Sequence, residues 1–197
     1  MNRNDKNPLV REEVALQPAI AVIELDSIAR GILVADTILW EAQLELLFAE
    51  PVQPGKYVIL FTGSVQDLES ALRTGSERAG CALVDQMLIQ QVHEQVLVGL
   101  RRSGRLQGTL DALGVVETAT VATALLAADA ALKTSAVDLL ELRIANGLGG
   151  KSFFTLTGEV SDVRSSITTA ATLASERGHL VRDVVIPRPH ADLVRHL

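Results

Sequence analysis

Ile20-Ala-Val-Ile-Glu24 decides the fold of this chain, because it recurs 93 residues later as Leu113-Gly-Val-Val-Glu117. Both stretches are short apolar runs of the kind that form buried strands. Each is followed by a residue suited to cap a helix, Ser27 or Thr120, and then by a segment rich in Ala and Leu. The same strand and helix therefore occur twice.

The repeat continues to the end of the chain. Thr62-Gly63 matches Thr157-Gly158 at an offset of 95, and His93 matches His190 at an offset of 97. Two small insertions account for these changes in offset. Both fall between predicted elements, where extra residues cost little closure entropy.

Both copies predict one order of elements: strand, helix, two strands, helix, strand. In copy one the segments are Ile20 to Leu25, the helix after Ser27, Leu44 to Glu50, Tyr57 to Thr62, Val65 to Arg78 and Ala82 to Ile89. In copy two they are Leu113 to Thr118, the helix after Thr120, Val137 to Ile144, Ser152 to Thr157, Val160 to Glu176 and Leu180 to Ile186. This β-α-β-β-α-β order predicts an α/β (α+β) chain of two tandem ferredoxin-like domains, each an antiparallel sheet with helices on one face.

The repeat also predicts the division of the chain. We expect an N-terminal extension over residues 1–18, a first domain over 19–100, a linker over 101–111 and a second domain over 112–197. The extension is polar and without periodicity. The linker follows a short helix that begins near His93, and its two glycines, Gly104 and Gly108, are typical of a connecting segment.

The composition excludes several classes of protein. Hydrophobic residues make up 48% and charged residues 21%, which is typical of a globular chain. A mean hydropathy of +0.26 is high for a soluble monomer and favours surface that is buried between subunits. A net charge of −6 argues against a nucleic-acid partner.

The sequence also argues against secretion and against a membrane span. Cys81 is the only cysteine, so no intramolecular disulfide can form, and no signal peptide opens the chain. The most apolar window, Leu113 to Leu132, contains Glu117 and Asp129, which are costly in lipid. We expect a cytoplasmic protein.

Several stretches of both copies resemble one known protein family. Copy two resembles a bacterial microcompartment shell domain, and the stretches that carry the resemblance are Leu113-Gly-Val-Val-Glu-Thr118, Ala127-Ala-Asp-Ala130, Lys151 to Gly158 and Val185-Ile-Pro-Arg-Pro-His190. Copy one is a diverged version that keeps Glu24, Ala35-Asp36, Gly55-Lys56, Thr62-Gly63 and His93. Together they are similar to the tandem-domain, trimer-forming shell proteins (BMC-T), in the element order that is not permuted.

The resemblance implies a function and a set of partners. It implies a structural shell subunit and not an enzyme, in a homotrimeric, pseudo-hexameric, single-layer tile whose central pore passes small metabolites. The implied partners are further copies of the chain, hexameric and pentameric shell proteins, and encapsulated enzymes. The implied location is the microcompartment shell.

The resemblance also assigns the pore. In the family the loop between the second and third strands of each domain lines it, which here gives Val52, Gln53, Pro54 and Gly55 in copy one and Asn146, Gly147, Leu148 and Gly149 in copy two. Such a pore is neutral and lined by amides, suited to small polar or anionic metabolites. Some similar shell proteins hold an iron–sulfur cluster through a pore-loop cysteine, but neither loop has one. We therefore expect no cofactor and no metal.

Contacts between tiles use, in the family, a Lys at the end of the first helix and the Arg of the Pro-Arg-Pro-His segment. Copy two has both, as Lys133 and Arg188, whereas copy one has Trp40 and Gln91 at those positions. Two roles remain open for Trp40. It is either a buried anchor between tiles or a core residue.

Other residues imitate catalytic or binding motifs. Residues 145–152 fit a relaxed phosphate-loop pattern, but a predicted strand follows where that motif needs a helix. His93 and His190 lack further ligands nearby in sequence, so we expect helix caps or edge contacts and no metal site. Glu24 and Glu117 lack a partner base, which favours structural hydrogen bonds over catalysis. No catalytic residue is therefore predicted.

Cys81 lies at a junction of helix and strand, where we expect a small buried residue. The rival function is a trimeric ferredoxin-like ligand-binding sensor or small enzyme, because this fold hosts many functions. That rival predicts a closed oligomer with a ligand cleft and no lateral assembly.

Overall fold

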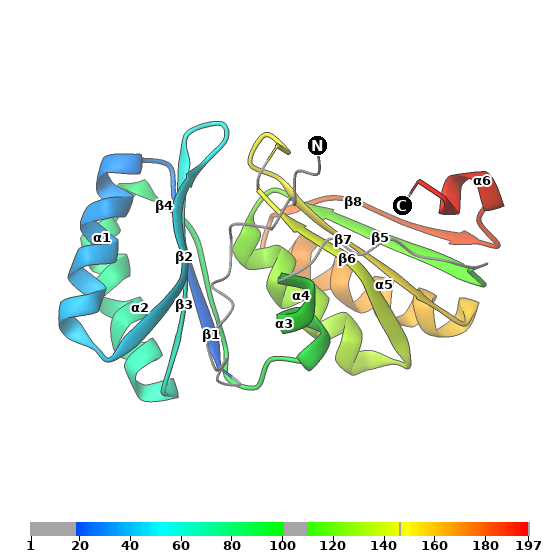
Figure 1. The fold of residues 1–197 in the computed structure, drawn as a ribbon, viewed down its shortest axis with the longest axis horizontal. Coiled ribbons are helices and arrows are strands. Elements are labelled where there is room, and N and C mark those ends of the chain that lie inside the picture. The colour runs from blue at the N-terminus through cyan, green and yellow to red at the C-terminus, as the bar shows by residue number, and fades with distance from the viewer. Residues whose placement is uncertain (1–18, 101–109, 146, 197) are drawn as a thin grey trace, which may run out of the picture.

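The computed structural model describes residues 19–100, 110–145 and 147–196 (Figure 1). Copy one contains β1 (Ile20–Leu25), α1 (Ile28–Glu41), β2 (Leu44–Val52), β3 (Lys56–Gly63), α2 (Val65–Ala79), the 3₁₀ turn η1 (Gly80–Ala82), β4 (Leu83–Ile89) and α3 (Glu94–Leu100). Copy two contains β5 (Ala112–Thr118), α4 (Val121–Thr134), β6 (Val137–Ile144), β7 (Ser152–Gly158), α5 (Val160–Glu176), β8 (Leu180–Pro187) and α6 (Ala191–Val194). The predicted order is confirmed in both copies.

Each copy forms a four-stranded antiparallel sheet. The strand orders are β2-β3-β1-β4 and β6-β7-β5-β8, as a ferredoxin-like domain requires. Ile20 pairs with Thr62 and Ile89, and its counterpart Leu113 pairs with Thr157 and Ile186. The register is thus the same in the two sheets, so a position in one copy identifies its counterpart in the other.

The sheet of copy one is buried on both faces. All six residues of β1 are buried. Ala21 and Ile23 belong to a cluster with residues of α1 and α2, whereas Ile20 and Val22 belong to a larger cluster that includes copy two. Alternate residues of a strand point to opposite faces, so copy two covers the face that the helices of copy one leave open.

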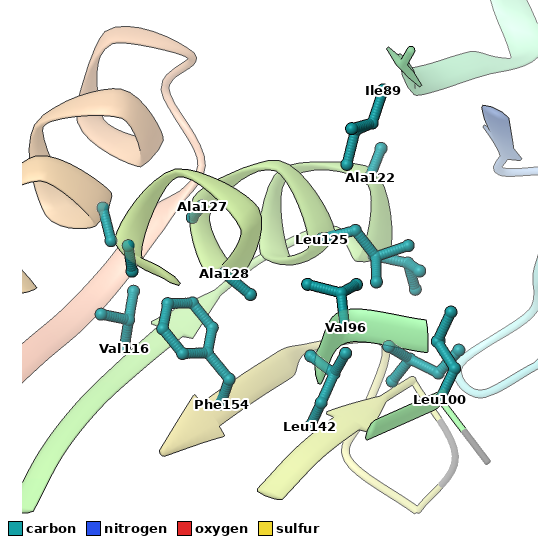
Figure 2. Close-up of a cluster of buried hydrophobic side chains, with 14 of the residues drawn as sticks. Ile89, Val96, Leu100, Val116, Ala122, Leu125, Ala127, Ala128, Leu142 and Phe154 are labelled. Atoms are coloured by element: carbon teal, nitrogen blue, oxygen red, sulfur yellow. The ribbon is translucent and has the colours of Figure 1, made fainter. Parts of the chain in front are cut away.

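The helix that covers this face is α4, which lies between the two sheets (Figures 1 and 2). Ala122 lies beside Ile89 of copy one, and Ala128 lies beside Phe154 of copy two. The alanines of α4 have little side chain to separate the helix from its neighbours. The helix is therefore buried around most of its circumference.

One local prediction is wrong. Cys81 lies in η1 and its side chain is exposed. The buried residues on either side of it are Ala79, which ends α2, and Ala82, which ends the 3₁₀ turn, so the turn leaves Cys81 facing solvent. Within the described residues, no helix is long and apolar enough to cross a bilayer.

Candidate functional site: paired loops and the interface between the copies

Two loops lie next to each other at one edge of the molecule, at the top of Figure 1. The turn between β2 and β3 consists of Gln53, Pro54 and Gly55, with a cis bond between the first two. The loop between β6 and β7 contains three glycines with positive φ, at Gly147, Gly149 and Gly150. These are the two loops that the resemblance assigns to the pore.

The loops touch at Gly150. A Cβ atom placed on this glycine would lie 2.9 Å from Cδ of Pro54 and 3.1 Å from the carbonyl oxygen of Gln53. The φ angle of Gly150 is 82°, which side chains other than glycine rarely adopt. Glycine is therefore required here both by backbone conformation and by the close approach of the first loop.

Lys56 ties the two loops together at their base. Its Nζ donates to Oε1 of Glu24 at 2.8 Å, to the carbonyl oxygen of Ala119 at 2.9 Å and to that of Gly150 at 3.4 Å. Oε2 of Glu24 accepts a hydrogen bond from the backbone N–H of Val121, at the N-terminus of α4, at 2.8 Å. The ion pair between Glu24 and Lys56 of copy one thus contacts two segments of copy two, the N-terminus of α4 and the loop before β7.

Burial raises the pKa of the Glu24 carboxyl, and the Lys56 ammonium and the Val121 N–H oppose this rise. The carboxyl has no exposed surface. Its position at the N-terminus of α4 is also favourable to negative charge. The predicted structural hydrogen-bonding role of Glu24 is confirmed.

A second polar contact, which sequence reasoning missed, lies on the same face of copy one. Asp85 on β4 accepts hydrogen bonds from the hydroxyls of Thr120 at 2.6 Å and Thr123 at 2.7 Å and pairs with Arg177. Burial raises the pKa of Asp85, but these two hydroxyls and the guanidinium together hold it below its usual value. Copy two has Arg182 at the position of Asp85, so the repeat gave no signal for this site.

A third contact joins the end of α4 to the segment after β4. Nζ of Lys133 donates to the carbonyl oxygen of Gln91 and to Oδ2 of Asp129. Oδ1 of Asp129 accepts from the backbone N–H of His93 at 2.8 Å. Lys133 of copy two therefore contacts Gln91 of copy one, so residues of both copies build this junction.

The two histidines cap short helices, which is one of the two roles predicted for them. Nδ1 of His93 accepts from the N–H of Gln95 at 3.3 Å, and Nδ1 of His190 accepts from the N–H of Asp192 at 3.2 Å. Among the described residues there is no group of three or more His, Cys, Asp and Glu side chains placed to hold a metal. Strand β7 follows the glycine-rich loop, so the phosphate-loop pattern lacks its helix.

The eight residues that the sequence assigns to the pore differ in their exposure to solvent. Val52 ends β2 with a buried side chain, and its carbonyl oxygen accepts from the N–H of Gly55. Leu148 is half-buried. The exposed residues are Gln53, Pro54, Gly55, Gly147 and Gly149, and Asn146 lies outside the described residues.

The residues assigned to tile contacts lie on the surface. Trp40, at the end of α1, is 86% exposed, so the alternative that placed it in the core is wrong. Arg188 is exposed and has a φ of 50°. Lys133 is exposed over 44% of its side chain.

Copy one and copy two differ most in how their first helices are covered. Ile32 of α1 is 56% exposed, whereas its counterpart Leu125 of α4 is fully buried. Ile28 and Leu39 are also exposed, and their counterparts, Val121 and Leu132, are buried. The open face of the second sheet is likewise uncovered, with Val184 of β8 exposed and its counterpart Met87 of β4 buried. Within residues 19–100, 110–145 and 147–196, one helix face and one sheet face thus carry exposed apolar side chains.

Comparisons with known proteins agree with this architecture. The BMC domain matches the chain twice, at residues 19–92 and 112–189. The bacterial microcompartment shell protein PduT from Citrobacter freundii is 38% identical over 92% of this chain and 98% of its own length. The bacterial microcompartment shell protein EutM from Escherichia coli K12 is 33% identical over 43% of this chain and 84% of its own length, which corresponds to one copy.

Solved structures show the same relationship. A microcompartment protein from Desulfitobacterium hafniense DCB is 47% identical, with a TM-score of 0.76 over 90% of this chain and 98% of its own. A fused permuted hexameric shell protein is 22% identical with a TM-score of 0.59, which shows likeness of fold alone. The chain belongs to the BMC domain family, as two tandem domains of the BMC-T kind, and is a structural subunit of a bacterial microcompartment shell.

Proposed function

We propose that three copies of this chain close head to tail into a pseudo-hexameric tile of the shell, with a central pore built from the paired loops. The observation that carries the proposal is the uncovered face of α1. The side chains that α4 buries against copy one are exposed at the same positions of α1, at Ile28, Ile32 and Leu39. A neighbouring chain's second domain offers the matching sheet face.

The contact within the chain is the template for the contact between chains. Copy one presents its open sheet face to α4 of copy two, and α1 lies on the opposite side, away from copy two (Figure 1). A contact between two different faces of the same unit generates a ring when its rotation closes, and we propose closure after three chains. Six similar domains, two from each chain, then surround one axis.

The polar groups support the same arrangement. Glu117 and Lys151 are the counterparts of Glu24 and Lys56, and their ion pair at 2.9 Å is only partly buried in one chain. In the ring, Glu117 accepts from the N–H of the neighbouring copy's Ile28, the counterpart of Val121. An ion pair already formed at this place lowers the ordering cost of the contact.

The ring places three copies of each loop around the axis. The proposed lining is Gln53, Pro54, Gly55, Asn146, Gly147, Leu148 and Gly149, while the side chain of Val52 stays in the core. Glycine leaves backbone amides open to a passing molecule. With no ionisable side chain in either loop, the pore suits small polar or anionic metabolites.

The remaining partners follow from the family. We propose that the tile contacts hexameric and pentameric shell proteins at its edges and encapsulated enzymes on one face, without a catalytic role of its own. PduT and EutM are both named as microcompartment shell proteins. Lys133, Arg188 and Trp40 lie near the proposed edges.

The test is the mass of the full chain in solution by light scattering. We expect about 63 kDa, three times the 21.1 kDa of one chain. Ile32→Glu places a charge in the proposed contact and should give a folded monomer. Thr172→Glu is the control, because Thr172 is exposed on α5, whose counterpart α2 does not cover copy two.

A wild-type chain that stays monomeric or dimeric at all concentrations would contradict the proposed ring, because it cannot surround a pore. An Ile32→Glu chain that remains trimeric would place the contact elsewhere. Circular dichroism of both variants shows whether each is folded.

A further inference from the structure

We infer that Trp40 stacks on Arg188 of the neighbouring copy at each of the three contacts between chains, and that Asp36 accepts a hydrogen bond from the N–H of the neighbouring copy's His190. This inference rests on the proposed ring and specifies its chain-to-chain junction. The partner is a second copy of this chain.

The template is the junction inside the chain. At the end of α4, Lys133 donates to the carbonyl oxygen of Gln91, and Asp129 accepts from the N–H of His93. The carbonyl of Gln91, which accepts, and the N–H of His93, which donates, both lie in the segment between β4 and α3. One helix end thus meets one strand end, through two contacts.

The repeat gives the counterpart of each group. Helices α1 and α4 both have 14 residues and both begin after a hydroxyl N-cap, so Trp40 stands at the position of Lys133 and Asp36 at that of Asp129. Strands β4 and β8 pair with the central strands in the same register. Arg188 therefore stands at the position of Gln91, and His190 at that of His93.

The chemistry of these counterparts is complementary. Within the chain, the Lys133 ammonium contacts the Gln91 carbonyl. Between chains, the Trp40 indole and the Arg188 guanidinium take these two positions. A guanidinium near an indole face forms an attractive cation–π pair. Asp36 retains the carboxylate of Asp129, and His190 retains its backbone N–H. Among the described residues no carboxylate pairs with Arg188, and Trp40 is 86% exposed.

The surroundings of the junction show the same complementarity. Val96 of α3 is fully buried against copy two, whereas its counterpart, Leu193 of α6, is 43% exposed. Oε1 of Gln95 accepts from the N–H of Leu139 at 2.7 Å. The counterpart of Gln95 is Asp192, whose carboxylate can accept from the N–H of the neighbouring copy's Leu46.

A depression in the surface marks where α6 would dock. It lies at the end of α1 and is lined by Leu39, Ala42, Gln43, Leu44, Glu45, Thr62 and Gly63. In copy two the corresponding surface, around Asp138 and Leu139, is contacted by Gln95 of α3. The occupant inside the chain is thus α3, and the occupant between chains is α6 of the next copy.

The tile therefore has two kinds of junction. Three junctions inside chains carry Lys133 and Gln91, and three between chains carry Trp40 and Arg188. Neighbouring shell proteins meet alternating surfaces around the tile.

Trp40 is the only tryptophan in the chain, so its fluorescence reports on this junction alone. The experiment uses the full chain at a concentration where light scattering shows trimer and no larger assembly. We expect acrylamide to quench wild-type trimer about two-fold less than the Ile32→Glu monomer, since stacking covers one indole face. Arg188→Ala should restore most of the quenching while the mass stays that of the trimer. Arg164→Ala, at an exposed position of α5, is the matched control and should change nothing.

The outcomes separate the junction from the ring. A trimer in which Trp40 is quenched as in the monomer, or in which Arg188→Ala has no effect, overturns the junction and leaves the ring standing. Protection of Trp40 that appears only in assemblies larger than the trimer assigns it to contacts between tiles and also overturns the junction. A chain that never forms a trimer overturns both proposals.

Discussion

Glu24 and Glu117 show how one residue in two copies acquires two environments. The Glu24 and Lys56 side chains are 0% and 19% exposed, whereas those of Glu117 and Lys151 are 35% and 50% exposed. The difference arises because copy two covers the first pair, whereas the described part of the chain leaves the second pair partly exposed. The internal repeat thus offers a matched control for each buried contact.

At the residue scale we predict that Lys56→Ala destabilises the chain by about 3 kcal/mol, because it leaves a buried carboxylate without its cation. The counterpart change, Lys151→Ala, should cost at most about 1 kcal/mol in the monomeric Ile32→Glu background, where its ion pair is partly exposed. Urea unfolding of both variants in that background measures the two costs. Equal costs would contradict the assigned role of Lys56.

The cost of Lys56→Ala should also depend on pH. Burial already raises the folded-state pKa of Glu24 above its ordinary 4.5, and loss of Lys56 raises it further. Because the folded-state pKa is the higher one, the carboxyl contributes stability at a pH below its unfolded-state pKa. This contribution is lost as the pH rises through its folded-state pKa. The difference in unfolding free energy between wild type and variant should therefore be largest near neutral pH and shrink as the pH falls through the raised folded-state pKa of Glu24, above its ordinary 4.5.

At the scale of elements, the two loops act as one unit. The first loop is shaped by Pro54 and Gly55, and the second by glycines that let its backbone pass within contact distance of the first. Because the loops belong to different copies, their contact sets the relative position of two hairpins. The shape of the proposed pore therefore depends on a contact between residues far apart in sequence, with Gln53 and Pro54 of the first loop lying against Gly150 of the second.

We predict that Gly150→Ala destabilises the chain more than Gly147→Ala does. Both glycines have positive φ, 82° and 73°, so both variants incur a backbone cost of about 1–2 kcal/mol. Only at Gly150 does the new Cβ meet Pro54, which adds about 1–3 kcal/mol of overpacking, whereas nothing lies within 4 Å of a Cβ at Gly147. Thermal unfolding of the two variants measures the difference. Equal melting temperatures would show that the loops are free to separate.

At the scale of the whole molecule, the two copies share a hydrophobic core. One cluster contains Ile20, Val22 and Ile89 of copy one together with Leu125 and Phe154 of copy two. Helix α4 belongs to both layers because it packs on both sheets (Figure 2). The two domains are therefore expected to unfold together.

We predict that Leu125→Ala costs about 2–5 kcal/mol, as truncation of a fully buried leucine does, and that copy one loses stability with copy two. Tyr57, the only tyrosine, is buried in copy one and reports on it in a Trp40→Phe background. In urea, Leu125→Ala should lower the unfolding midpoint seen by Tyr57 fluorescence as much as the midpoint seen by far-ultraviolet circular dichroism of the whole chain. A Tyr57 transition that does not move would show that the domains unfold independently.

The sequence by itself determined the order of elements, the tandem domains, the loop between the second and third strands of each copy, and the family. These features are local: strands and helices follow from the periodicity of apolar residues, caps such as Ser27 and Thr120 act within one turn, and a repeat is visible without knowing how its copies meet. Helix capping was one of the two roles predicted for His93 and His190, and the structural role of Glu24 was predicted because no partner base lies near it in sequence.

Only the tertiary structure decided which residues meet across the copies. Lys56 reaches Gly150, Asp85 binds Arg177, and Lys133 contacts Gln91, although each pair is far apart in the chain. It also decided that Cys81 and Trp40 are exposed and that Val52 is buried. The physical reason is that these contacts depend on how one folded domain is oriented on the other, which is set by the shared packing of α4 between two sheets and leaves no periodic signal in the sequence.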